Sequence, residues 1–69
     1  MIIGDIGNII KTRRKELAIT QSDLAELADV TKRTVVKLEN GEGNPTLFVL
    51  NKILNVIGMD VKVEVIKNY

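Results

Sequence analysis

The sequence contains no cysteine, no histidine and no tryptophan, and these absences exclude several classes of function. Without cysteine and histidine there are no disulfides, no zinc sites of the usual kind and no His-assisted nucleophiles. Phe48 and Tyr69 are the two aromatic residues, too few for the stacking platforms that bind single-stranded nucleic acid. We therefore expect no enzyme activity, no cofactor and no metal.

Long apolar runs are also missing. No stretch approaches the ~18–20 residues that cross a bilayer, and the N-terminus lacks a signal-peptide pattern. We therefore expect a cytoplasmic protein with no membrane partner. Of the 69 residues, 45% are apolar and 28% are charged, which is typical of one globular domain. Because so small a chain has a limited core, and has no cysteine or histidine to staple it, oligomerisation is the stabilising device that remains.

Apolar spacing and capping residues predict four helices, at about residues 5–17, 21–28, 32–40 and 47–57. Thr20 and Asp23 have the spacing of a capping box, and Thr31 and Thr46 are placed to cap the next two helices. Two sets of apolar residues are spaced to face the core: Ile6, Ile9, Ile10 and Leu17 in the first helix, and Leu47, Leu50, Ile53, Leu54 and Ile57 in the fourth.

The spacing of the apolar residues changes near the end of the sequence. Valines at 61, 63 and 65 alternate with polar residues, which predicts one β-strand with an apolar face. Because the chain offers no second strand, we expect the strands of two subunits to pair antiparallel about a two-fold axis. Surplus apolar residues of the fourth helix would cover this ribbon. The predicted dimer interface comprises Phe48, Val49, Val56, Val61, Val63 and Val65.

The second and third predicted helices are separated by three residues, as in a helix-turn-helix. An ordinary pair of core helices would explain the spacing about equally well. The outward face of the third helix favours a helix-turn-helix. When residues are placed at the ~100° per residue of an α-helix, that face is basic. That face comprises Arg33, Val36, Lys37 and Asn40, with Lys32 at the helix start. The first helix adds Lys11, Arg13, Arg14 and Lys15, so a chain of net charge +1 can still present a basic stripe.

Two runs carry a resemblance to a known family. The run from Thr20-Gln21 to Glu39-Asn40-Gly41, followed by Asn44-Pro45-Thr46-Leu47, resembles the phage repressor/Cro type of helix-turn-helix, the XRE family. The resemblance spans about residues 6–58 and implies a bundle of α-helices that binds operator DNA as a dimer. A short domain that ends in a strand also resembles the HipB-like antitoxin branch, in which the strands of two subunits pair.

The resemblance also implies roles for individual residues. Gln21 opens the second helix and would contact a phosphate, together with Asn40 and Arg14. The base-reading positions would be Lys32, Arg33, Thr34 and Lys37, and the helical wheel adds Val36 as a contact for a thymine methyl group. Arg14 would pair with Glu39, and that ion pair can also be purely structural. Two positions depart from the family pattern: Asp29 replaces the common turn glycine, and Glu42 is acidic near the expected phosphates.

The sequence thus predicts a mainly α, four-helix repressor-like DNA-binding domain over residues 1–58. Residues 59–69 would be its dimerisation strand. The predicted function is sequence-specific regulation of transcription by a homodimer on a palindromic double-stranded DNA operator. The protein would act as a repressor, and a toxin protein would be a further partner if it is an antitoxin. The alternative is a protein-binding module, an antitoxin or adaptor, with little DNA binding of its own.

Overall fold

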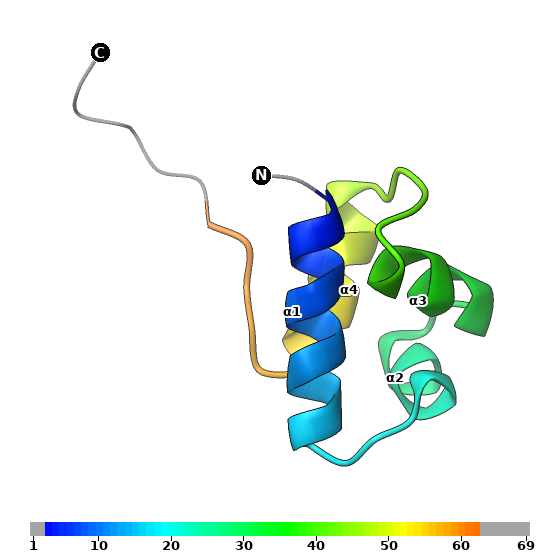
Figure 1. The fold of residues 1–69 in the computed structure, drawn as a ribbon, viewed down its shortest axis with the longest axis vertical. Coiled ribbons are helices and arrows are strands. Elements are labelled where there is room, and N and C mark those ends of the chain that lie inside the picture. Colours follow the sequence, from blue (N-terminus) through cyan, green and yellow to red (C-terminus); the bar gives the residue numbers. More distant parts are fainter. Residues whose placement is uncertain (1–2, 63–69) are drawn as a thin grey trace.

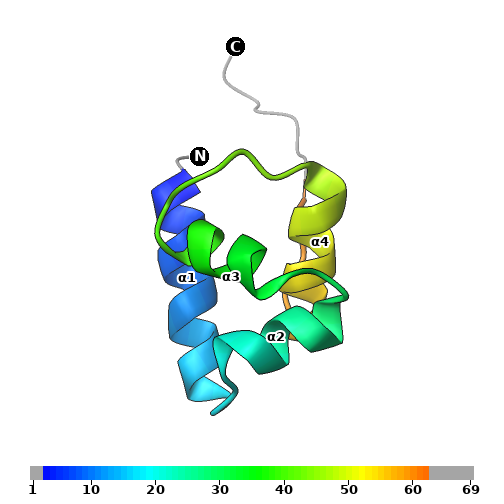
Figure 2. The ribbon, with the colours of Figure 1, turned by 90° about the vertical axis from the view of Figure 1, so that its right-hand side faces the viewer.

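The computed structural model describes residues 3–62 and contains four helices in that range. They are α1 (Ile3–Glu16), α2 (Gln21–Ala28), α3 (Lys32–Glu39) and α4 (Leu47–Val56). Figure 2 shows α1 and α4 on either side of α3, and both views show α2 below α3 (Figures 1 and 2). The prediction of a mainly α, four-helix fold is confirmed for this part of the chain. Each helix boundary lies within two residues of its expected position.

Threonine side chains begin three of the four helices, as predicted. Thr20 Oγ1 accepts a hydrogen bond from the Asp23 amide at 3.0 Å, and Asp23 Oδ2 accepts one from the Thr20 amide at 2.9 Å. The bond from the Thr20 backbone lowers the pKa of Asp23 below its ordinary value, because it favours the carboxylate. Thr31 and Thr46 cap α3 and α4 through the amides three residues later. These bonds fix where α2, α3 and α4 start.

The turn between α2 and α3 depends on a left-handed residue. Asp29 has φ 56° and ψ 47°, and its amide ends α2 by donating to the Glu26 carbonyl at 3.2 Å. Aspartate adopts this conformation more readily than most residues with a side chain, so it can replace the expected glycine. Lys52 of α4 donates to the Asp29 carbonyl at 3.1 Å. The turn is thereby tied to the fourth helix.

The core lies between the four helices and matches the predicted set in most positions. Among the residues that the structure describes, ten apolar ones are buried: Ile10, Leu24, Ala25, Ala28, Val35, Leu38, Leu50, Ile53, Leu54 and Ile57. Three residues expected to face inward are instead well exposed, namely Ile9 at 48%, Leu17 at 40% and Leu47 at 55%. The prediction is wrong for Ile9 and Leu17 because apolar spacing locates a broad face, whereas α1 buries only a narrow stripe against its neighbours. It is wrong for Leu47 because this residue is the first of α4, at the exposed end of the helix.

The buried stripe of α1 also contains a glycine that is not in the predicted core set. Gly7 is buried one turn before Ile10. A Cβ at Gly7 would collide with the carbonyl oxygen of Leu38 and lie 3.0 Å from that of Glu39. The backbone of α1 therefore packs directly on the C-terminal end of α3, with no side chain between them.

Residues 59–62 lie along α1, on the side away from α3 (Figure 1). Met59 and Val61 are half-buried against the core, in an apolar groove of about 330 Å³ that Ile6, Ile9, Leu50 and Leu54 also line. Residues 59–62 do not form a β-strand in the structure. The rest of the predicted strand, with Val63 and Val65, lies outside the described residues.

Candidate nucleic-acid interface

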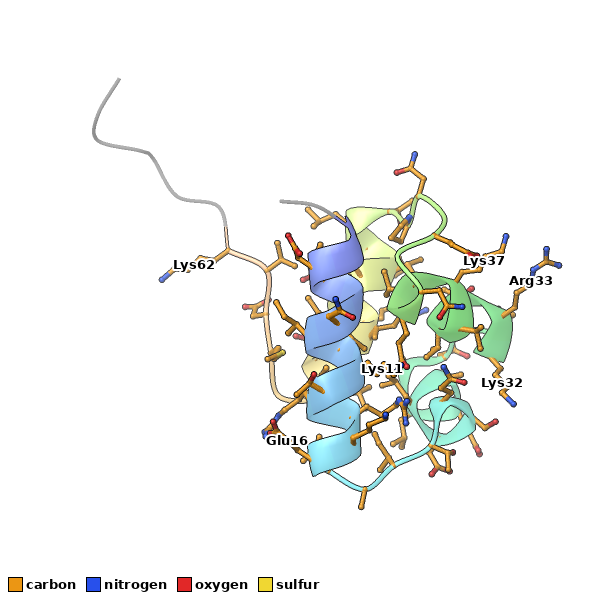
Figure 3. All side chains as sticks on the ribbon, in the orientation of Figure 1. Lys11, Glu16, Lys32, Arg33, Lys37 and Lys62 are labelled. Atoms are coloured by element: carbon orange, nitrogen blue, oxygen red, sulfur yellow. The ribbon has the colours of Figure 1, made fainter. Side chains whose placement is uncertain are left out.

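The outer face of α3 is basic and exposed. Figure 3 shows Lys32, Arg33 and Lys37 projecting from α3 away from the body of the domain. All three are exposed, and none forms an ion pair within the part of the chain that the structure describes. A helix with uncompensated basic side chains and an accessible N-terminus has the form that enters a DNA major groove.

The other predicted base-reading residues are less exposed. Thr34 is half-buried, and its hydroxyl lies 2.9 Å from that of Thr31. Val36 is also half-buried, although the helical wheel placed it on the outward face. Asn40, which is predicted to contact phosphate and not a base, is exposed at the C-terminal end of α3. The structure thus groups all six residues on or beside α3, with the three cations outermost.

An ion pair buried behind this face joins α1 to α3. Arg14 donates from Nε to Glu39 Oε2 at 2.7 Å and from Nη2 to Glu39 Oε1 at 3.0 Å. The side chains are 11% and 1% exposed, respectively. This bidentate bond raises the pKa of Arg14 above its ordinary value, so the guanidinium stays charged. Its Nη1 also donates to the Ile19 carbonyl at 2.9 Å, which ties down the loop before α2.

Gln21 extends this network to the surface. The half-buried side chain of Gln21, the first residue of α2, donates from Nε2 to Glu39 Oε1 at 3.2 Å. The sequence predicts a phosphate contact for Gln21 and an ion pair between Arg14 and Glu39. It does not predict this hydrogen bond between Gln21 and Glu39. The two residues are 18 positions apart, so no local pattern could reveal it.

Two of the four basic residues of α1, Arg13 and Arg14, are held by other contacts. Arg14 is buried, and Arg13 donates to the Ile57 carbonyl at 3.0 Å and pairs with Glu16 at 3.3 Å. In Figure 3, Glu16 lies on the opposite side of the domain from Arg33. Arg13 and Arg14 therefore do not extend the basic face of α3, whereas Lys11 and Lys15 are exposed.

The predicted dimer residues also divide between different surfaces. Val61 lines the groove beside Leu50 and Leu54 of α4. Phe48 does not line this groove; it is 72% exposed, with the Lys52 ammonium 5.2 Å from its ring centre. Val49 and Val56 are half-buried against the core. Phe48 and Val61 therefore do not share this groove.

Comparison with known proteins places this geometry in a family. A family model described as "Helix-turn-helix" matches residues 10–63. The chain is 38% identical over 52 residues to an uncharacterized HTH-type transcriptional regulator of Methanothermobacter thermautotrophicus, and the match covers 75% of each chain. It is 34% identical over 56 residues to the immunity repressor protein of Bacillus phage phi105, covering 81% of this chain and 39% of that protein.

A solved structure supports the same fold. The clp gene regulator ClgR from Corynebacterium glutamicum superposes with a TM-score of 0.80 at 20% identity, covering 87% of this chain and 64% of that one. The chain belongs to the helix-turn-helix family of transcriptional regulators. Within residues 3–62, no helix has the length and apolar character needed to cross a membrane.

Proposed function

We propose that the protein is a sequence-specific repressor that binds a palindromic duplex DNA operator as a homodimer. The observation that carries the proposal is the outer face of α3, where Lys32, Arg33 and Lys37 are exposed and, within the described residues, have no acidic partner. The family supports DNA as the partner, and the name of the phage relative supports repression. Arginine and lysine on such a helix can bond guanine edges in the major groove.

Each residue of the interface has a distinct role in this proposal. Gln21 and Asn40 hold the phosphate backbone, which sets the position of the domain on the duplex. Arg14, also expected near phosphate, acts from behind as the partner of Glu39, because its guanidinium is bonded to Glu39 and Ile19. The residues that read bases are Lys32, Arg33, Thr34, Val36 and Lys37.

Selection from a random duplex library tests the proposal. We expect a palindrome whose half-sites are about one DNA turn, ~34 Å, or a multiple of it apart, because a two-fold dimer presents two copies of α3. We also expect affinity to fall steeply with salt, since cations at phosphates release counterions. Recovery of no consensus at moderate salt would contradict sequence-specific binding.

Replacing Arg33 separates base reading from charge. Arg33→Ala is expected to weaken binding to the best site by about 1–3 kcal/mol and to relax one base position. The matched control is Arg33→Lys, which keeps the charge but cannot bond guanine in the planar, bidentate manner of arginine. It should retain affinity for unrelated duplex while losing preference at the same position. Titration of both variants against selected and scrambled duplexes measures affinity and base preference. An unchanged preference in Arg33→Ala would show that another surface reads the bases.

The dimer proposal rests on the segment after α4. A chain ended at Lys62 keeps Met59 and Val61, which pack against the core, so its fold should survive. We expect this chain to sediment as a monomer at micromolar concentration, because it lacks the strand residues 63–69. Its DNA affinity should fall although no proposed DNA contact is removed, since two half-sites are no longer held together. If the shortened chain still sediments as a dimer, another surface makes the main contact.

A second candidate function is a protein-binding module, such as an antitoxin of the HipB-like kind. The observation that favours it is the exposure of three large apolar side chains near the ends of α2 and α4: Leu27 at 65%, Leu47 at 55% and Phe48 at 72%. The product of the adjacent gene is the partner to test, by calorimetry with the purified protein. Leu27→Ser, at a residue outside both the proposed dimer interface and the proposed DNA contacts, should then weaken that complex and leave DNA affinity unchanged.

A further inference from the structure

The most informative contact outside the exposed face is the one between Gln21 and Glu39. Glu39 is the last residue of α3 and Gln21 is the first residue of α2. Their bond therefore joins the proposed phosphate contact to the helix that carries the base-reading residues. Glu39 Oε1 accepts from both Gln21 Nε2 at 3.2 Å and Arg14 Nη2 at 3.0 Å.

The chemistry of the bond fixes how the Gln21 amide is turned. A carboxylate can only accept hydrogen bonds, so it must face the nitrogen of the amide and not its oxygen. Nε2 has two hydrogens, and one of them is engaged by Glu39. Because the amide is planar, the direction of the second N–H is then determined. No hydrogen bond from that second N–H is formed within residues 3–62.

Charge balance explains why a carboxylate can lie so close to a phosphate site. Glu39 is 1% exposed on its side chain, and Arg14 bonds both of its oxygens. The guanidinium neutralises the carboxylate, so an approaching phosphate meets a neutral pair and an oriented N–H. A lone glutamate at this position would repel the phosphate.

We propose that Glu39, held by Arg14, is a positioning residue that orients the Gln21 amide toward a DNA phosphate and thereby fixes the register between that phosphate and α3. This inference rests on the proposed function, because it assumes that Gln21 contacts the backbone. Arg14 and Glu39 do not touch DNA themselves.

A double-mutant cycle tests the coupling. Arg14→Met/Glu39→Leu replaces the ion pair by apolar groups of similar size, which is often neutral for stability. In the natural chain, Gln21→Ala is expected to weaken DNA binding roughly tenfold on every sequence, the size of one hydrogen bond to a charged group. In the Met/Leu background the same substitution should cost under about twofold, since the amide is no longer oriented. Urea unfolding of each variant verifies that it is folded.

A conservative background separates orientation from mere packing. Arg14→Met/Glu39→Gln removes the charges but keeps an oxygen that can accept from Gln21, so the penalty of Gln21→Ala should return toward tenfold. An equal penalty in all three backgrounds would overturn the positioning role. A Gln21→Ala variant of the natural chain with unchanged affinity would overturn it as well, while Arg33→Ala would still report whether the domain reads DNA.

The side-chain amide signals of Gln21 give a second readout that needs no variant. In the free protein, one hydrogen should be shifted downfield and protected from exchange by the carboxylate. Addition of the selected operator should then shift the other hydrogen. Two equivalent, fast-exchanging hydrogens in the free protein would contradict the proposal regardless of DNA affinity.

Discussion

Glu39→Ala is expected to lower the free energy of unfolding by about 3–5 kcal/mol. The substitution leaves the Arg14 guanidinium charged in a site where the side chain is 11% exposed, with its main partner gone. It also removes the acceptor for Gln21, so α1, α2 and α3 all lose a shared contact. For a chain of 69 residues, whose total stability should be roughly 3–10 kcal/mol, this loss is at least about a third of the total.

Urea denaturation followed by circular dichroism measures the effect. The matched control is Glu26→Ala, which makes the same chemical change at an exposed position of α2 and should stay within about 0.5 kcal/mol of the natural chain. Arg14→Met/Glu39→Leu should recover most of the stability, because no unpaired charge is left inside. A Glu39→Ala variant as stable as the Glu26→Ala control would show that the ion pair is dispensable for folding.

Gly7→Ala is expected to destabilise the domain by about 2 kcal/mol. The added methyl group would meet the carbonyl oxygens of Leu38 and Glu39, which belong to backbone and cannot rotate away. The Leu38 carbonyl also accepts from the Gly41 amide at 3.1 Å, so displacing it disturbs the end of α3. Overpacking of this kind costs about 1–3 kcal/mol or more, and it must exceed the roughly 1 kcal/mol that alanine gains over glycine in a helix.

Gly4→Ala provides a control of opposite sign in the same helix. A Cβ at Gly4 has no heavy atom within 4 Å, so only the gain in helix propensity remains, up to about 1 kcal/mol. In parallel urea titrations, the free energy of unfolding should therefore fall for Gly7→Ala and rise for Gly4→Ala. If both variants were more stable than the natural chain, α1 and α3 would have to lie farther apart than the structure places them.

Much of the local structure of this protein follows from short-range sequence patterns. Thr20, Thr31 and Thr46 each cap a helix by bonding an amide three residues later, and Asp29, Gly41 and Gly58 each take a left-handed conformation at a helix end. Such features depend on neighbours along the chain, so they can be predicted without knowing the fold. The basic outer face of α3 is likewise a consequence of helical periodicity, and its exposure follows once Val35 and Leu38 are buried.

The spacing between helices was decided only by the tertiary structure. Periodicity grouped Ile6, Ile9, Ile10 and Leu17 on one face of α1, yet the close packing on α3 buries Gly7, Ile10 and Arg14 and leaves Ile9 and Leu17 exposed. That packing is set by the absence of a Cβ at Gly7, a property that apolar spacing does not detect.

The hydrogen-bond network behind the basic outer face of α3 depends on the same packing. The resemblance to a known family implied that Arg14 meets Glu39, but the bond from Gln21 to the same carboxylate is seen only in the folded structure. The sequence by itself determined where the helices of this protein begin and which face of α3 is basic, because those are interactions within a few residues. The tertiary structure decided which side chains of different helices share a hydrogen bond, because that depends on distances between elements that no local pattern encodes.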